Sequence, residues 1–244
     1  MFDSNYEMKR ARAVVRDPIK TLASMLIREE LVGKNLEKFN FEYKKSKSIS
    51  SVNSGNFFKM AQQDIRSKWG DNVHVFPIIV SSDKTELTKC GKRSIWPIYV
   101  TCGNFSTDIM TSKKGSLLSG FIPYLPYNDE ELKKMLHDHD IKAIGKQKIC
   151  LTILKRYFEQ KFFQYFIRTI KMCNEKGPIY LQIGRGSNKR VELFMPVLLS
   201  FVGDNEGASQ FLCIKSTKCY RPCRICNVCK KNIHFAGKFF IFSI

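Results

Sequence analysis

The sequence predicts an α/β protein in which a mixed sheet is crossed by one long helix. Two apolar runs rich in β-branched residues, 75–80 and 95–102, are separated by a short polar link, as in a β-hairpin. From Lys146 to about Lys176, apolar residues recur at three- and four-residue steps, which is typical of an amphipathic helix. A further continuous apolar run at residues 197–202 predicts a strand buried on both faces.

The N-terminal part is predicted to be helical and basic. Residues 1–48 carry apolar side chains at roughly helical spacing, and Asp17 and Pro18 supply a helix start. Residues 49–72 are predicted to form a Ser- and Lys-rich linker followed by a helix. We expect the apolar side of that helix to consist of Phe57, Met60, Ile65 and Trp69.

The core is expected to span residues 73–212. A third strand is predicted over residues 117–125, and Asn128 and Asp129 then cap a short helix over residues 130–137. After the long helix, residues 179–202 predict a strand, a tight polar turn and a strand. Strand, strand, strand, helix, strand is the order of a ribonuclease-H-like fold, since the long helix would make the crossover that parallel strands need.

The charge of the chain is strongly unbalanced. It has 41 Lys and Arg against 22 Asp and Glu, a formal net charge of +19. Such an excess attracts polyanions, so nucleic acid is the first candidate partner, although a generic basic composition from an AT-rich genome would also account for the frequent Lys, Ile and Phe. We expect no membrane span, because no run of about 18 apolar residues occurs, and no N-terminal signal sequence.

Several short stretches resemble one family. SSDKTELT, WPIYVTCGN and LLSGFIPYLP resemble the catalytic core of Plavaka-type transposases, mobile-element enzymes of the Kyakuja–Dileera–Zisupton group that are related to CACTA transposases. Further matches, SGNFFKMAQQDI upstream and FMPVLLSFVGDNEGASQ and PCRIC downstream, follow in the family's order over about residues 54–230. The resemblance independently implies the ribonuclease-H-like core. It also implies DNA as partner, a nuclear location, and cutting and strand transfer by two-metal-ion chemistry, and it leaves homo-oligomerisation open.

Two acids match the family's catalytic positions. Asp83 ends the first strand, and Asp204 follows the last strand directly after Gly203. The resemblance therefore implies that both are catalytic ligands of Mg²⁺ or Mn²⁺. The interpretations without chemistry are a surface acid at a strand end and a turn residue. The remaining nearby acids are expected to be solvated or to have loop and cap roles: Glu86, Glu206, Asp108 and Asp129.

The family's third acid has no counterpart in this sequence. After Asp204 only Glu206 carries a carboxylate, and residues 235–244 do not resemble the family. We therefore expect an incomplete, C-terminally truncated core that is inactive or poorly active in strand transfer, since the second metal ion would lack an anchor.

Residues 213–234 form a Cys-rich segment with five of the nine cysteines. Without a signal sequence, such clustering favours metal over disulfides. Zinc takes four thiolate or imidazole ligands. Cys223 and Cys226 form a C-x-x-C pair that matches the family's PC-x-x-C. Cys219 and either Cys229 or His234 could complete a compact site, or Cys223 and Cys226 could be half of a site whose other half is absent.

Two other functions compete with a transposase-derived enzyme. One is a non-catalytic nucleic-acid-binding protein with a basic helical arm and a small zinc module, in which Asp83 and Asp204 are bystanders. The other is a decayed reading frame without activity. The separation of the Asp83 and Asp204 carboxylates distinguishes the transposase-derived enzyme from the nucleic-acid-binding protein. About 5 to 8 Å fits a shared metal site, and more than about 12 Å does not.

Overall fold

The computed structural model describes residues 12–28, 31, 52, 55–87, 94–138 and 140–203. The chain divides into two compact units. Arg12–Pro123 and Phe162–Val202 form the first, which contains the sheet and is called the sheet unit below. Of the described residues, the second contains Tyr124–Lys161 and Gly203 and is called the helical unit. The domain boundaries given above from the sequence stay predictions.

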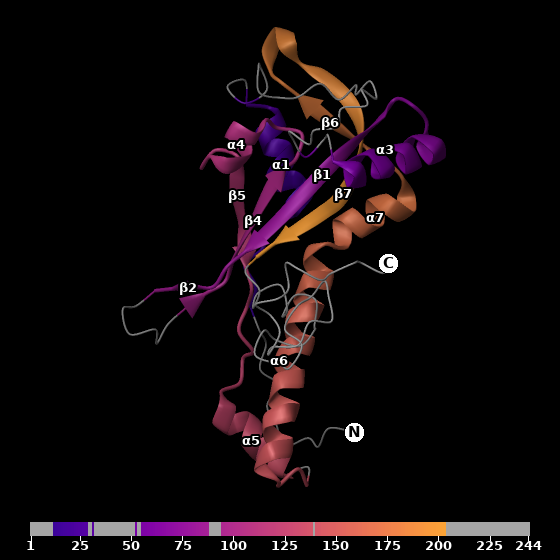
Figure 1. Cartoon of the computed structure of the whole chain (residues 1–244). Coiled ribbons are helices and arrows are strands. Elements are labelled where there is room, and N and C mark those ends of the chain that lie inside the picture. The colour runs from indigo at the N-terminus through magenta and orange to yellow at the C-terminus, as the bar shows by residue number, and fades with distance from the viewer. Residues whose placement is uncertain are drawn as a thin grey trace, which may run out of the picture. The chain divides into compact units, whose positions relative to one another are not determined.

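The sheet unit is built on a five-stranded mixed sheet in the order β5-β4-β1-β7-β6 (Figure 1). Its strands are β1 (Val73–Ser82), β4 (Pro97–Cys102), β5 (Ser116–Phe121), β6 (Ile179–Ile183) and β7 (Arg190–Val202). The central strand β1 is antiparallel to β4 and parallel to β7. The α/β class, the mixed sheet and the pairing of the first two apolar runs are therefore confirmed.

Strand β1 is central because it is apolar on both faces. Successive residues of a strand point to opposite faces, and all residues from Val75 to Ile78 are buried. Phe76 is fully buried, and its ring packs edge-on against Phe194 of β7 with the ring centroids 5.7 Å apart. Both faces of β1 are thus covered, which leaves the ends of the strand as the places where polar groups can act.

The link between β1 and β4 is more than a hairpin loop. It contains a second small sheet in which β2 (Thr85–Glu86) pairs with β3 (Ser94–Ile95). The single strand predicted over residues 95–102 is therefore wrong, because Trp96 separates β3 from β4. The division falls where Pro97 lacks an N–H group and restricts the residue before it.

The outer edge of β5 is covered by the segment that precedes α1 (Pro18–Leu26). Val15 forms an antiparallel bridge with Gly120, and the N–H of Phe121 donates to the carbonyl of Val14 at 3.1 Å. A Cβ on Gly120 would lie 2.6 Å from the Val14 oxygen, so only glycine allows the two backbones to approach this closely. The strand itself ends at Phe121, earlier than the 117–125 predicted.

Helix α1 begins where the sequence predicted. Asp17 is its N-cap, and the carboxylate accepts hydrogen bonds from the N–H groups of Ile19 at 2.8 Å and Lys20 at 3.1 Å. The helix contacts β4, β5 and β6. Its fully buried side chains are Leu22, Met25 and Leu26. Most of the remaining N-terminal region predicted to be helical lies outside the described residues.

Helix α3 (Asn56–Trp69) confirms the helix predicted before β1, but its buried side is only partly the one predicted. Phe57 and Met60, which were predicted to face the core, are 64% and 61% exposed. Helix α3 contacts β1 and β7. The buried residues are Phe58, Gln62 and Ile65. Ile65 is therefore buried as predicted, but Gln62 occupies the middle of this stripe, so a pattern based on apolar residues alone placed Phe57 and Met60 on the wrong side.

The long helix predicted from Lys146 to about Lys176 is wrong as a single element. Two helices occupy this stretch, α6 (Ile144–Phe166) and α7 (Arg168–Lys176), and they are separated at Ile167. Ile167 has φ −89° and ψ 6°, a bridge conformation between the α and β regions. Neither Pro nor Gly stands at this point, so the sequence gives no signal for the break. The short helix predicted over residues 130–137 is confirmed as α5 (Asp129–Asp138).

Strands β6 and β7 form the predicted hairpin, but the burial predicted for residues 197–202 is wrong. The buried residues of β7 are 194–196, and Val202 is 54% exposed. Pairing with β6 ends at the pair of Ile179 with Phe194, so the second half of β7 has β1 on one side only. The edge position explains why this apolar run is only partly covered.

Candidate metal centre

The carboxyl end of β1 is fixed by a side-chain hydrogen bond. Ser82, the last residue of the strand, is buried, and its hydroxyl donates to the carbonyl of Pro97 at 2.9 Å. This bond ties the end of β1 to the start of β4. Asp83 follows directly and is exposed. An accessible carboxylate on a fixed backbone suits a hard divalent cation, because the backbone determines where the oxygens can reach.

The parallel pairing of β1 with β7 brings the carboxyl ends of both strands to the same edge of the sheet. The last residue pair is Ser81 with Val202. In open α/β sheets, sites form at such an edge. Along the sequence, Asp83 stands two residues after Ser81 and Asp204 two residues after Val202. Asp204 lies outside the described residues, so its distance from Asp83 stays a prediction.

A β-bulge sets this register. Ile78 pairs with Leu198 but Ile79 pairs with Ser200, so Leu199 is the extra residue. The bulge advances β7 by one residue relative to β1. Only because of this advance do the two acids stand at equal sequence distances from the last pair. A one-residue slip in a strand moves every later side chain to the opposite face, so the bulge matters for which residues can meet.

The second half of β7 is held by the last turns of α6 within the sheet unit. The ring of Phe163 packs edge-on against Phe201, with the centroids 6.1 Å apart. Phe162 and Phe166 stack beside it at 6.5 Å, and both are buried. Since Phe201 directly precedes Val202, this aromatic packing fixes β7 up to the edge where Asp83 lies.

Two polar residues of WPIYVTCGN belong to the core. Cys102 is completely buried, and burial raises the pKa of its thiol to about 12. The thiol donates to Oδ1 of Asn104 at 3.3 Å, and Nδ2 of Asn104 donates to the carbonyl of Val75 at 3.3 Å. A neutral, buried thiol is chemically inert. This stretch therefore joins the loop after β4 to β1, a role of Asn104 that the sequence did not reveal.

A comparison of the chain with models of protein families identifies its family. The family model described as Plavaka transposase matches residues 3–236, nearly the whole chain. The chain belongs to the Plavaka transposase family. The match extends past residues 54–230 at both ends. Membership indicates a transposase-derived function and implies DNA as partner. A search of curated proteins and a search of solved structures gave no match.

Two other acids of the Plavaka-family chain lie on short elements of the sheet unit. Glu86 is exposed on β2, and Asp108 is exposed in the first turn of α4 (Thr107–Thr111). Asp108 is thus a residue of a short helix rather than of a loop. A carboxylate in the first turn stabilises a helix through its interaction with the helix dipole. This effect is enough to explain an acid at position 108.

Asp129 stands at the start of α5 in the helical unit. The ammonium group of Lys155 donates to its carboxylate at 2.8 Å, and this hydrogen bond lowers the pKa of Asp129 from its usual value. Asn128 and Glu131 form a capping box, in which the Asn128 side chain accepts from the Glu131 N–H at 2.8 Å and the Glu131 carboxylate accepts from the Asn128 N–H at 3.0 Å. The predicted cap at Asn128 and Asp129 is therefore confirmed.

Of the metal ligands predicted from the sequence, only Asp83 lies among the described residues. Among the described residues, no group of three or more His, Cys, Asp or Glu side chains could hold a metal ion. Within the same ranges, no helix is both long and apolar enough to cross a membrane. The predicted ligands and alternatives outside the described residues are Asp204, Glu206, Cys219, Cys223, Cys226, Cys229 and His234.

Proposed function

We propose that this chain supplies a DNA-cutting site of a transposase, in which Asp83 and Asp204 bind a divalent cation at the edge of a ribonuclease-H-like sheet. The observation that carries the proposal is the register of β1 and β7. After the bulge at Leu199 the strands pair as far as Ser81 and Val202, and each acid follows two residues later.

Chain geometry limits how far apart the two acids can be. Neighbouring strands are about 4.8 Å apart, so two residues at equal positions on continuing strands have Cα atoms about 5 Å apart. Two residues of chain span at most about 7 Å, so each acid stays within about that distance of its last paired residue. If both chains continue along their strands, the separation of about 5 Å supports carboxylates that share one cation or a pair of cations.

The topology supports the ribonuclease-H-like assignment. Three antiparallel strands in sequence, β1, β4 and β5, are followed by helices and then by a strand that is parallel to β1 and beside it. The hairpin partner β6, which was predicted together with β7, pairs antiparallel at the outer edge of the sheet. Because β6 pairs only with the first residues of β7, the carboxyl ends of β1 and β7 remain adjacent.

The donor chemistry fits Mg²⁺ or Mn²⁺, since both take carboxylate oxygens. When bound, the cation supplies Lewis acidity and activates water for attack on phosphorus. The protein's own contribution is positional. The hydrogen bond from Ser82 to Pro97 holds the backbone next to Asp83, and the exposure of Asp83 leaves room for a phosphodiester beside it.

Cation binding tests the proposal. We predict that Asp83→Asn and Asp204→Asn each weaken Mn²⁺ binding at least about tenfold, and that the double variant is no weaker than either single one. Groups that act on one ion are not additive, whereas independent sites are. Binding is measured by electron paramagnetic resonance of free Mn²⁺, with Glu86→Gln as a control. Additive losses, or a loss only in the Glu86 variant, would refute the shared site.

The second candidate function is non-catalytic nucleic-acid binding. It is favoured by the basic character of α6 and α7, where residues 144–176 carry eight Lys and Arg but only Glu159 and Glu175 as acids. Retained DNA binding together with Mn²⁺ affinity that neither Asp substitution changes would support this function over cutting.

We also propose that residues 213–234 bind zinc through Cys223 and Cys226, with further ligands among Cys219, Cys229 and His234. The predicted result is that Cys223→Ser with Cys226→Ser abolishes zinc retained through purification, while Cys150→Ser, a cysteine outside the segment, leaves it unchanged. Because thiolates must be deprotonated to bind, zinc uptake should release protons and fail at acidic pH. Elemental analysis measures the metal, and equal zinc in all variants would exclude the site.

A further inference from the structure

The hairpin of β6 and β7 projects past the rest of the sheet. The first residue of β7 that pairs with β1 is Leu193, whereas residues 190–192 pair with β6 alone. Beyond Leu193 the sheet is thus reduced to a two-stranded antiparallel ribbon, visible in Figure 1 as the orange loop above the label β6. We call residues 184–190 the ribbon tip.

The ribbon tip is basic and open. Arg185 and Lys189 are exposed, and within the part of the chain that the structure describes neither forms an ion pair. Arg190 is 56% exposed and is held by Glu192, with Nε 2.7 Å from Oε1. Gly186 has φ +56°, and a Cβ placed on it would meet no atom within 4 Å. Gly184, the first residue of the tip, is buried, and its N–H donates to the carbonyl of Leu26 at 2.7 Å. The end of α1 therefore holds the base of the tip, while Arg185 and Lys189 stay exposed.

We propose that the ribbon tip is a second DNA contact, which binds the phosphate backbone of a duplex remote from the cutting edge. The inference rests on the proposed function for its DNA partner. The exposed Arg and Lys side chains of the tip can contact phosphates, which orient a protein on DNA without reading its sequence. Charge complementarity therefore selects the polyanion over another basic copy of this chain.

The length of β7 sets the distance between the two DNA contacts. The strand has 13 residues and runs from the ribbon tip to the edge beside Asp83. At about 3.3 Å per residue it spans about 40 Å. A straight duplex covers that distance in about 12 base pairs. The tip thus contacts DNA about one helical turn away from the phosphodiester at Asp83.

The test is the salt dependence of duplex binding. We compare the wild-type chain with Arg185→Gln/Lys189→Gln, on a duplex of about 30 base pairs and by fluorescence anisotropy. Each lost phosphate contact reduces the slope of log K against log salt by about 0.9, so the tip variant should lose about 1.8. Between about 50 and about 200 mM salt, wild-type affinity should fall about tenfold more than that of the tip variant.

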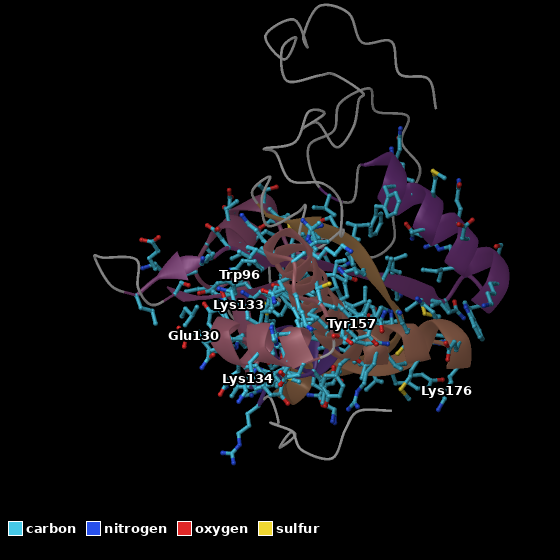
Figure 2. All side chains as sticks on the ribbon, turned by 90° about the horizontal axis from the view of Figure 1, so that it is seen from below. Trp96, Glu130, Lys133, Lys134, Tyr157 and Lys176 are labelled. Carbon is cyan, nitrogen blue, oxygen red and sulfur yellow. The ribbon has the colours of Figure 1, made fainter. Side chains whose placement is uncertain are left out.

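Two further variants make the result specific. Lys133→Gln/Lys134→Gln on α5 removes the same charge from a surface that also carries Glu130 (Figure 2), and it should keep the wild-type slope. Arg185→Lys/Lys189→Arg preserves the charge of the tip and should keep that slope too. Equal slopes in the tip variant and wild type, or equal losses in the tip and α5 variants, would overturn the proposal.

The same experiment separates this inference from the proposed function. One outcome is that the wild-type chain binds DNA, the tip variant has a smaller slope of log K against log salt, and the Asp83 and Asp204 substitutions leave Mn²⁺ affinity unchanged. In that case only the proposed cutting site is refuted. If the shared cation site holds and the tip variant keeps its slope, only the ribbon contact fails. Tyr180, 75% exposed on β6 next to the ribbon, offers self-association as the competing role. A tip variant that lowers the oligomeric mass in light scattering without changing the slope would support self-association and overturn DNA contact.

Discussion

Replacing Phe76 by alanine is expected to lower the free energy of unfolding of the sheet unit by about 3 to 5 kcal/mol. Phe76 lies on the central strand β1, is fully buried and packs edge-on against Phe194. Truncation removes the apolar transfer energy of the ring, the aromatic contact and the dispersion contacts around it, and it leaves a cavity beside Phe194 on one face of the sheet. Most domains have only about 5 to 15 kcal/mol of stability, so this loss is a large share.

The matched control is Phe57→Ala on α3. The substitution is chemically the same, but Phe57 is 64% exposed, so the expected loss is below about 1 kcal/mol. Urea unfolding followed by tryptophan fluorescence measures both variants, and Trp69 and Trp96 both lie in the sheet unit. Similar losses for the two substitutions would show that the packing around β1 described above is wrong.

The central strand and its neighbours could be predicted because their signals are local and strong. Residues 75–80 are apolar at every position but one, proline, which is compatible with burial on both faces, and the acid after them marks the strand end. The cap at Asp17 and the capping box at Asn128 follow from side chains that satisfy free N–H groups of the first helical turn. These features depend on neighbours within four residues.

The features that the sequence did not predict depend on distant neighbours. Gln62 is buried because α3 lies against β1 and β7, not because of its own polarity. The break at Ile167 has no local cause in the form of Pro or Gly. The bulge at Leu199 is the most consequential case, because leucine favours no bulge and yet the register of both predicted acids depends on it.

The stretches that resemble the family combine two kinds of residue. Gly120 permits the approach of Val14 to β5, and Asn104 links the loop after β4 to β1, so both are explained by packing. Asp83 is exposed, and no described hydrogen bond or core contact explains it. A residue that belongs to a family pattern but has no structural task is the better candidate for chemistry.

DNA cutting should depend on both acids. We predict that residues 1–244 nick supercoiled DNA slowly in Mn²⁺ and more slowly in Mg²⁺. The resemblance to the family assigns only Asp83 and Asp204 of residues 1–244 to catalytic positions, and the one acidic side chain after Asp204 is that of Glu206. Mg²⁺ requires near-ideal octahedral geometry and binds poorly where a ligand is missing, whereas Mn²⁺ tolerates a depleted site. Asp83→Asn and Asp204→Asn should each reduce this nicking at least about 100-fold, and the double variant should be no worse, as expected of residues that act as a unit.

Conversion of supercoiled to open-circular DNA by these four proteins, at matched concentrations and with Glu86→Gln as control, tests the central claim most directly. The account predicts Mn²⁺-dependent nicking in the wild type and the Glu86 variant, and none above background in the three proteins that lack Asp83 or Asp204. Rapid Mg²⁺-dependent cleavage that survives both Asp substitutions would contradict it, because the chemistry would then lie on other residues.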